Sequence, residues 1–414
     1  MTGAEPPANG PTTSATPRFA LRSAALEQPG HNGGSADRHG NAPVIIGALR
    51  TAIGNRGGCF RDLDTTQLAA PVLSALDDRL PEGLDVSQVI LGNVRGPGGN
   101  PARLAALAAG INTRVPAVTV DQQCGSGMAA LECAWHRCRS VRGVVLAGGV
   151  QAVSTQPLTL WPPTGKEPAR PFERAPFAPA PWQDPDMGIA ADLLAEEHGI
   201  TRERQDRYAL RSHMLAVTTR DAGGYDEEIV TVAGQLRDER PRPGFTAARL
   251  AHFRPQFRPE GTVTAASSCG ISDGAAAVTM VDAETHRALG VPGLRIVGCA
   301  SAGCDPDRPG WGIVPAVEAA RDQAHVGLDQ MAAIEFNEAF AAQVLACADG
   351  LGIDETRICP QGGAIGLGHP WAASGAILLV RLFSELVRSG HGGYGLAAIA
   401  IGGGQGAAMI VQSC

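Results

Sequence analysis

Short apolar runs alternate with longer segments of helical spacing along most of the chain, beginning at Pro43. The runs have the length of buried strands, and the segments between them place apolar residues three or four positions apart, as amphipathic helices do. Before residue 155 the pattern predicts strands at 44–49, 89–91, 116–120 and 144–147 and helices at 66–80, 101–109 and 125–139. After residue 270 it predicts strands at 294–299, 333–336, 396–401 and 407–411 and helices at 314–325, 340–351 and 372–389. Such alternation is typical of α/β layers.

The pattern occurs twice, which predicts two similar α/β halves separated by an insertion. Residues 155–185 interrupt it with closely spaced prolines, Trp161 and Trp182, and we interpret them as an irregular loop that could cover a ligand. Two charged amphipathic helices come next, at 187–198 and 202–221. We expect a first half at 42–154, a loop domain with a return to the first half at 155–285, and a second half at 286–414.

The composition indicates what kind of core the protein has and which kinds of partner it lacks. The 414 residues are 44% hydrophobic but only 4% aromatic, so we expect a core of small aliphatic side chains. The net charge of −7, with Lys166 as the single lysine, argues against a nucleic-acid partner. The ten cysteines form no CxxC pairs and have no histidines at ligand spacing, so we expect reduced thiols in a cytoplasmic protein without a metal site.

The first 41 residues differ from the rest of the chain. They are rich in Pro, Gly, Ser and Thr with little apolar periodicity, which predicts a disordered N-terminal extension. No apolar run in the chain approaches the roughly 20 residues that span a bilayer, so we expect no membrane partner.

The block Gln122-Gln123-Cys124-Gly125-Ser126-Gly127 places a thiol where a strand turns directly into a helix. The free N–H groups and the dipole of a helix N-terminus favour an anion, so we expect a lowered pKa for Cys124. Small Gly125 and Gly127 would let another molecule come close. Taken alone, the block is more typical of a small buried cysteine on a tight turn.

The second half contains three further candidate positions. Asn337 ends an apolar strand, where open α/β sheets bind ligands, although it could instead cap the next helix. His369 lies in the Gly-rich run 362–370 before a long helix, and is a candidate base. Gly402 belongs to Ala400-Ile401-Gly402-Gly403-Gly404-Gln405-Gly406, which is either a turn or a place where backbone N–H groups meet a reacting oxygen.

Together these four blocks resemble the thiolase family over roughly residues 43–413. Matching segments include Arg50-Thr51-Ala52-Ile53-Gly54, Gly92-Asn93-Val94, Asn100-Pro101-Ala102-Arg103, Gly261-Thr262-Val263-Thr264-Ala265 and Asp273-Gly274-Ala275-Ala276. The resemblance implies a duplicated five-layered α/β/α/β/α fold with an inserted loop domain that helps to bind coenzyme A. It also implies a homodimer or homotetramer, a coenzyme A thioester as substrate, and no tightly bound cofactor.

The resemblance assigns roles to individual residues. Cys124 would be acylated by an acyl-CoA, with His369 taking the thiol proton. One oxyanion hole would use Asn337 and His369, and another the backbone N–H groups of Cys124 and Gly402. Contacts with coenzyme A are expected from Met187, Ser268, Cys269 and Trp371.

The chain departs from the family pattern at Ala400. Thiolases normally have a second cysteine here, which removes an α-proton from the second acyl-CoA and returns one in thiolysis. A methyl group cannot carry a proton. We therefore expect an acyltransferase that passes the acyl group from Cys124 to a carbon, amine or hydroxyl acceptor, with altered Claisen and thiolysis chemistry.

Two alternatives remain open at this point. The first is an ordinary acetoacetyl-CoA or 3-oxoacyl-CoA thiolase, in which another group such as His369 or Cys304 supplies the missing step. The second is a non-catalytic acyl-CoA-binding subunit.

Overall fold

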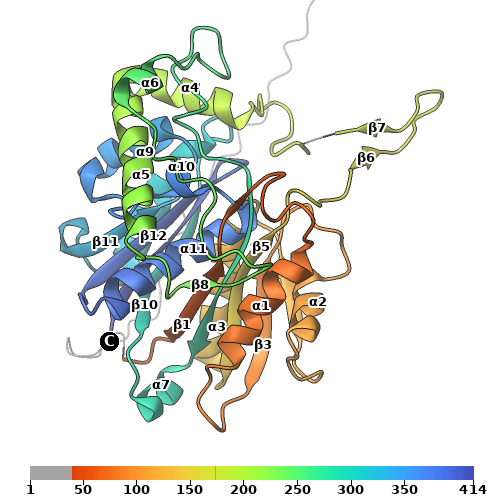
Figure 1. Cartoon of the computed structure of the whole chain (residues 1–414), viewed down its shortest axis with the longest axis vertical. Coiled ribbons are helices and arrows are strands. Elements are labelled where there is room, and N and C mark those ends of the chain that lie inside the picture. The colour runs from red at the N-terminus through yellow and green to blue at the C-terminus, as the bar shows by residue number, and fades with distance from the viewer. Residues whose placement is uncertain (1–39, 173) are drawn as a thin grey trace, which may run out of the picture. The chain divides into compact units, whose positions relative to one another are not determined.

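Two sets of strands with the same order form the core of the chain (Figure 1). The computed structural model describes residues 40–172 and 174–414, so all but the last two residues of the predicted extension lie outside the described residues. The first set has the order β4-β3-β5-β9-β1. Its bounds are β1 Val44–Thr51, β3 Val86–Gly92, β4 Ala117–Val120, β5 Val144–Gln151 and β9 Ser272–Val281. Strand β9 runs antiparallel to both of its neighbours, whereas β3, β4 and β5 are parallel.

The second set repeats this arrangement as β11-β12-β13-β10. Its bounds are β10 Leu294–Gly303, β11 Met331–Phe336, β12 Tyr394–Ile401 and β13 Gln405–Ser413. Strand β13 is antiparallel to both neighbours, like β9. A parallel bridge between Ile334 and Ile358 takes the place that β4 has in the first set. The two sets join edge to edge, because Val44 of β1 pairs with Arg295 of β10.

Helices cover both sets of strands in three layers. Helices α1 (Thr65–Asp77) and α2 (Pro101–Ala108) pack against the first set, and α8 (Ile313–Ala324) packs against the second, with α9 (Ala341–Leu351) beside it. Helices α3 (Ser126–Ser140) and α11 (Trp371–Phe383) pack against each other between the two sets. Three apolar clusters correspond to these interfaces, and the middle one contains residues of α3, α11 and both sets. The predicted five-layered α/β/α/β/α fold is therefore confirmed.

The insertion lies between β5 and β9. It contains α4 (Met187–Glu197), α5 (Arg202–Asp221), β8 (Ile229–Val230) and α6 (Ala247–Ala251). Helices α4 and α5 both contact α9 of the second half. The segment that the prolines predicted to be irregular contains one short hairpin, β6 (Leu160–Trp161) with β7 (Arg170–Pro171), which pairs with no other described strand.

The remaining described elements are short. They are β2 Gly54–Asn55, α7 Ala283–Leu289, α10 Ala364–Leu367, the 3-10 turns Pro309–Gly312, Leu328–Gln330 and Glu355–Arg357, and the π-helical turn Ser384–Arg388. The last of these continues α11, so the predicted helix at 372–389 changes its winding near its end. Among the helices described, none is both long and apolar enough to cross a membrane.

A buried ionic network connects the two halves with the insertion. The guanidinium of Arg50, on β1, lies 2.7 Å from Glu228 and 2.7 Å from Asp238, and all three side chains are almost completely buried. Arg381 of α11 forms a second ion pair with Glu228. Buried charges need such partners because desolvation makes an unpaired one very unfavourable.

Candidate active site

Cys124 lies on a tight turn between β4 and α3. Gln123 has a left-handed backbone with φ of 50°, and the Ser126 hydroxyl accepts from Gln122 N at 2.8 Å and donates to Gln123 O at 2.6 Å. Helix α3 begins at Ser126, with Gly125 as its N-cap. The thiol therefore stands just before the first turn of the helix, as the sequence predicted.

Two glycines bring this turn against the second half. A Cβ at Gly125 would lie 2.3 Å from Ile401 Cδ1, and a Cβ at Gly127 would lie 2.5 Å from Ala372 O. Ile401 precedes Gly402, and Ala372 lies three residues after His369. Cys124 thus lies beside the segments that contain Gly402 and His369.

The environment of Cys124 corrects one expectation. The pKa of the thiol is raised to about 12, first by burial and then by the charges of Cys269 and Asp121, while a backbone hydrogen bond lowers it. We expected the helix N-terminus to lower the pKa of Cys124. Desolvation outweighs this effect, because the turn is enclosed between the two halves. The resting group is a neutral thiol.

His369 is held in a fixed orientation at the start of α11. Its backbone N–H donates to Gly270 O at 2.8 Å, and its Nδ1 lies 2.6 Å from Ser374 Oγ. The side chain is buried, and burial lowers the pKa of the imidazole to about 4. The ring is therefore neutral near pH 7, and Nε2 is the nitrogen left to exchange protons with a ligand.

Asn337 comes directly after β11 and does not cap a helix. Helix α9 begins at Ala341 with Phe340 as its N-cap, so the capping alternative is wrong. The backbone N–H of Asn337 donates to Ala398 O at 2.9 Å, which fixes the residue beside β12. Its side-chain Nδ2 is buried and has no hydrogen-bond partner among the described residues. A buried donor of this kind is costly unless something else, such as a ligand oxygen, accepts from it.

Gly402 begins the turn between β12 and β13. Gly403 and Gly404 have φ of 85° and 75°, which favours glycine at both positions. A Cβ at Gly402 would lie 2.7 Å from Phe177 Cδ2, so a side chain of the insertion covers this turn. Ala400 lies two residues earlier on β12, opposite Gly406, and is buried.

The predicted coenzyme A contacts lie in three places. Ser268 pairs with Phe340, and its hydroxyl donates to Thr264 O at 2.7 Å. Cys269 donates its backbone N–H to Ala339 O at 2.9 Å. Trp371 is the first residue of α11, and Met187 is the first residue of α4. Ser268 and Cys269 therefore lie beside the loop that contains Asn337, and Trp371 lies beside His369.

Cys304 contacts the glycine turn between β12 and β13. Its backbone N–H donates to Gly404 O at 2.7 Å, and its Sγ lies 3.7 Å from Arg308 O. The thiol is therefore engaged within its own loop.

Two residues of the site were not predicted. Glu338 is buried and accepts from Tyr208 OH at 2.8 Å, Ser212 Oγ at 2.6 Å and Ile365 N at 3.1 Å, so it anchors the Asn337 loop to α5 and α10. Arg240 donates to Ile365 O at 3.0 Å and to Ser268 O at 3.1 Å. The position of Glu338 next to Asn337 was an available signal. Arg240 has no neighbouring motif in the sequence that would have revealed it.

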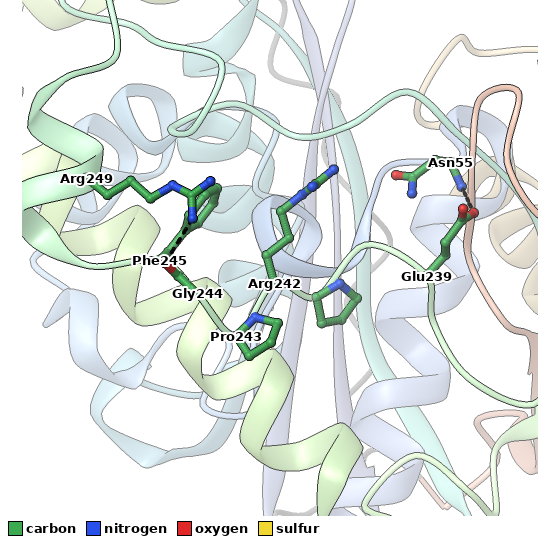
Figure 2. A pocket seen from close by; sticks show the side chains of 8 residues that line it. Asn55, Glu239, Arg242, Pro243, Gly244, Phe245 and Arg249 are labelled. Atoms are coloured by element: carbon green, nitrogen blue, oxygen red, sulfur yellow. Dashed lines mark hydrogen bonds between the residues drawn. The ribbon is translucent and has the colours of Figure 1, made fainter.

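A polar cavity of about 440 Å³ opens near Arg240 (Figure 2). Figure 2 shows Arg242, Phe245 and Arg249 along one part of its wall and Asn55 and Glu239 at another. The Arg249 guanidinium lies 5.6 Å from the centre of the Phe245 ring, and its Nη1 donates to Gly244 O at 3.3 Å. Guanidinium groups bind phosphates, and an aromatic ring can stack on a base.

Comparison with known proteins defines the class of this protein. Residues 43–284 match the thiolase N-terminal domain, and residues 291–413 match the thiolase C-terminal domain. The chain therefore belongs to the thiolase family, and it is a thiolase-type acyltransferase whose substrates are acyl-CoA thioesters.

Three individual proteins are similar to this chain over most of its length. A putative acetyl-CoA C-acetyltransferase, YhfS, from Bacillus subtilis is 40% identical over 375 residues, covering 89% of this chain and 98% of that protein. The acetyl-CoA acetyltransferase of Pseudomonas aeruginosa is 40% identical over 391 residues, covering 88% and 98%. The crystal structure of the Bacillus anthracis acetyl-CoA acetyltransferase superimposes with a TM-score of 0.83 at 35% identity, covering 90% and 99%.

Proposed function

We propose that this protein is an acetyl-CoA C-acetyltransferase, which joins two acetyl-CoA molecules or cleaves acetoacetyl-CoA with Cys124 as the nucleophile. The observation that carries the proposal is the close approach of Gly125 and Gly127 to Ile401 and Ala372, which sets Cys124 beside the segments of His369 and Gly402. The names of the relatives favour carbon–carbon chemistry over our first expectation of a transfer that could also use an amine or a hydroxyl acceptor.

In the first half-reaction, the neutral imidazole of His369 takes the thiol proton as Cys124 attacks the thioester carbonyl. A concerted transfer suits this pair, because burial disfavours a thiolate at Cys124 and an imidazolium at His369. The free Nδ2 donor of Asn337 and the backbone N–H groups of Cys124 and Gly402 would stabilise the oxyanions, each typically by about 3 to 4 kcal/mol. The proton on His369 then leaves with coenzyme A.

The cavity in Figure 2 is the proposed site for the phosphate and base end of coenzyme A. Arg242 and Arg249 would meet phosphate oxygens, and Phe245 offers an aromatic face. Met187, Ser268, Cys269 and Trp371 would contact the arm that leads to the thioester. This arrangement is supported by Arg240, which links the cavity segment to Ser268.

Intact-protein mass spectrometry after mixing with acetyl-CoA tests the nucleophile. We expect one acetyl adduct on the unmodified chain and none on Cys124→Ala. Cys133→Ala is the matched control, because Cys133 is an exposed thiol on α3, and it should still be acetylated. An adduct that persists on Cys124→Ala would overturn the assignment.

Ala400 supports a second candidate function, transfer to an acceptor that needs no deprotonation at carbon. Ala400 lies on β12, and its methyl group cannot carry a proton. The resemblance to thiolases implies a cysteine at this position. Consumption of acetoacetyl-CoA in the presence of coenzyme A distinguishes the two functions. Efficient thiolysis favours the acetyl-CoA C-acetyltransferase, and loading of Cys124 without thiolysis favours the second function.

A further inference from the structure

A completely buried carboxylate lies next to Asn337 in the chain. It belongs to Glu338, and it accepts three hydrogen bonds. Its Oε1 accepts from Tyr208 OH at 2.8 Å, and its Oε2 accepts from Ser212 Oγ at 2.6 Å and from Ile365 N at 3.1 Å. An ionised carboxylate accepts hydrogen bonds and donates none, so three donors suit that form. Loss of the carboxylate would leave buried donors unsatisfied.

Glu338 and Ser212 together cap helix α10 from outside the helix. The N-cap residue of α10 is Gly363, which has no side chain to fill this role. The backbone N–H groups of Gly363 and Gly366 both donate to Ser212 Oγ at 3.3 Å, and that of Ile365 donates to Glu338. These are N–H groups that a helix cannot satisfy within its own first turn. Figure 1 shows α10 beside α5, the helix that contains Ser212.

The glycines of this turn bring it into direct contact with the carboxylate and with α5. A Cβ at Gly363 would lie 2.4 Å from Glu338 Cδ and 2.6 Å from its Oε2. A Cβ at Gly366 would lie 2.8 Å from Ser212 O. The turn therefore lies against Glu338 and α5 with no side chain of its own at these two contacts.

The two groups that we assign to the acyl chemistry are attached to the two ends of this network. Asn337 is the residue before Glu338, and His369 comes two residues after the end of α10. The Asn337 Nδ2 has no partner among the described residues, so its direction depends on the backbone that Glu338 anchors. The His369 ring is held by Ser374, but the place of its backbone depends on the turn before it. A shift of either loop would move Asn337 or His369 relative to Cys124.

We propose that Glu338 is a positioning residue for the acetylation of Cys124, and that its carboxylate sets Asn337 and His369 relative to each other by joining their loops to α5. The inference rests on the proposed function, because both groups must act on the thioester at Cys124. The hydrogen bonds of the carboxylate go to protein groups, so Glu338 acts through these two residues. Reacting groups need placement within about 0.5 Å, and an error of about 1 Å costs about 100-fold in rate.

The rate of acetylation of Cys124, followed by rapid-quench mass spectrometry, tests the inference. Glu338→Leu should lower the rate at saturating acetyl-CoA by about 100-fold and change the half-saturating concentration by less than about 3-fold. Glu338→Gln should restore most of the rate. Its amide oxygen can accept from Ser212 and Ile365 while its amide nitrogen donates to the Tyr208 hydroxyl. Equal losses in both variants, or none in Glu338→Leu, would overturn the positioning role.

Ser212→Ala tests the same network with Glu338 in place, and it decides the question if Glu338→Leu does not fold. It removes the acceptor of two N–H groups of the turn, so the saturated rate should fall by about 10-fold. Tyr225→Phe is the matched control, because it also removes a buried hydroxyl, one that donates to Gln361 O, and it should keep the rate. Equal losses of rate in these two variants would indicate general loosening and contradict the inference.

A double-mutant cycle tests the connection with Asn337. Ser212→Ala should slow acetylation less in an Asn337→Ala background, because the donor that it displaces is already absent. Losses of the same size in both backgrounds would overturn the role through Asn337. The proposed function fails separately, if the unmodified protein forms no adduct on Cys124. If that adduct forms and the Glu338 and Ser212 variants acetylate at the unmodified rate, only the positioning role is wrong.

Discussion

At the scale of single residues, desolvation decides the resting charge of the catalytic groups. Cys124 stands before a helix N-terminus, and the sequence alone suggested a thiolate. The structure encloses the turn between two halves, so the thiol stays protonated and His369 stays neutral. The reaction that we propose would then move a proton between two neutral groups and would not depend on attraction within a preformed ion pair.

We expect the lowered pKa of His369 to set the pH dependence of acyl loading. A pKa lowered to about 4 leaves the imidazole unprotonated, and therefore able to accept a proton, until the pH falls toward that value. We expect the rate of acetylation of Cys124 to show no loss between about pH 8 and about pH 5 that reflects protonation of a base. Rapid-quench mass spectrometry across this range measures it. A decline with a midpoint near the ordinary histidine pKa would contradict the neutral, buried imidazole.

Ser374 should matter through the orientation of the ring. Its hydroxyl lies 2.6 Å from Nδ1, so Ser374→Ala should slow acetylation of Cys124 by about 10-fold while leaving the adduct on the same residue. Ser374→Thr, which retains a hydroxyl, is the matched variant. Equal rates in the unmodified protein and Ser374→Ala would show that packing alone orients the imidazole.

At the scale of elements, β4 is an edge strand with apolar surface beside it. It ends the described strand order, Val118 on it is 39% exposed, and Leu104 and Leu107 on α2 are 44% and 43% exposed. An exposed apolar edge of this kind is a template for pairing with another chain. It supports the expectation of a homodimer or homotetramer.

We expect Val118→Lys to weaken self-association, because the charge would be placed at the edge of β4. Light scattering coupled to size-exclusion chromatography should show a smaller mass than for the unmodified protein. Met214→Lys is the control, since Met214 is similarly exposed at 43% but lies on α5. An identical reduction in both variants, or none in Val118→Lys, would argue against β4 as the interface.

The elements also show what a sequence can and cannot predict here. The strand before Cys124, the helix after it and the helix after His369 were predictable, because each has a clear apolar period. Arg240 was not, since its importance arises only when the insertion folds back over Gly270. The close approach of Gly125 to Ile401 likewise depends on a contact between residues far apart in the chain. Packing of this kind leaves no local periodicity.

At the scale of the whole molecule, the buried ion pairs of Glu228 hold β1, α11 and the insertion together. Burial alone would raise the pKa of Glu228, but Arg381 and Arg50 lower it below its usual value. A lowered folded-state pKa means that this carboxylate stabilises the fold above the unfolded pKa, and that the contribution is lost as the pH falls through the folded value.

Glu228→Gln should therefore be strongly destabilising near pH 7. Removing one partner leaves two buried guanidinium groups with less compensation, which costs about 3 to 5 kcal/mol in comparable cases. Urea unfolding measures the loss. Glu284→Gln is the control, because its ion pair with Arg142 is largely exposed and should contribute less than about 1 kcal/mol. Similar losses in both variants would show that the buried network is not a special source of stability.

The repeated strand order has an evolutionary consequence. Cys124 precedes α3 and His369 precedes α11, and these helices occupy corresponding places in the two strand sets. Cys124 and His369 thus come from corresponding places in two copies of one α/β module. The arrangement is that of a two-fold homodimer fused into a single polypeptide. An ancestor with identical modules would have had two equivalent centres. Divergence of the copies, with an insertion in only one of them, would leave a single asymmetric centre in which one copy holds the proposed nucleophile and the other holds the proposed base.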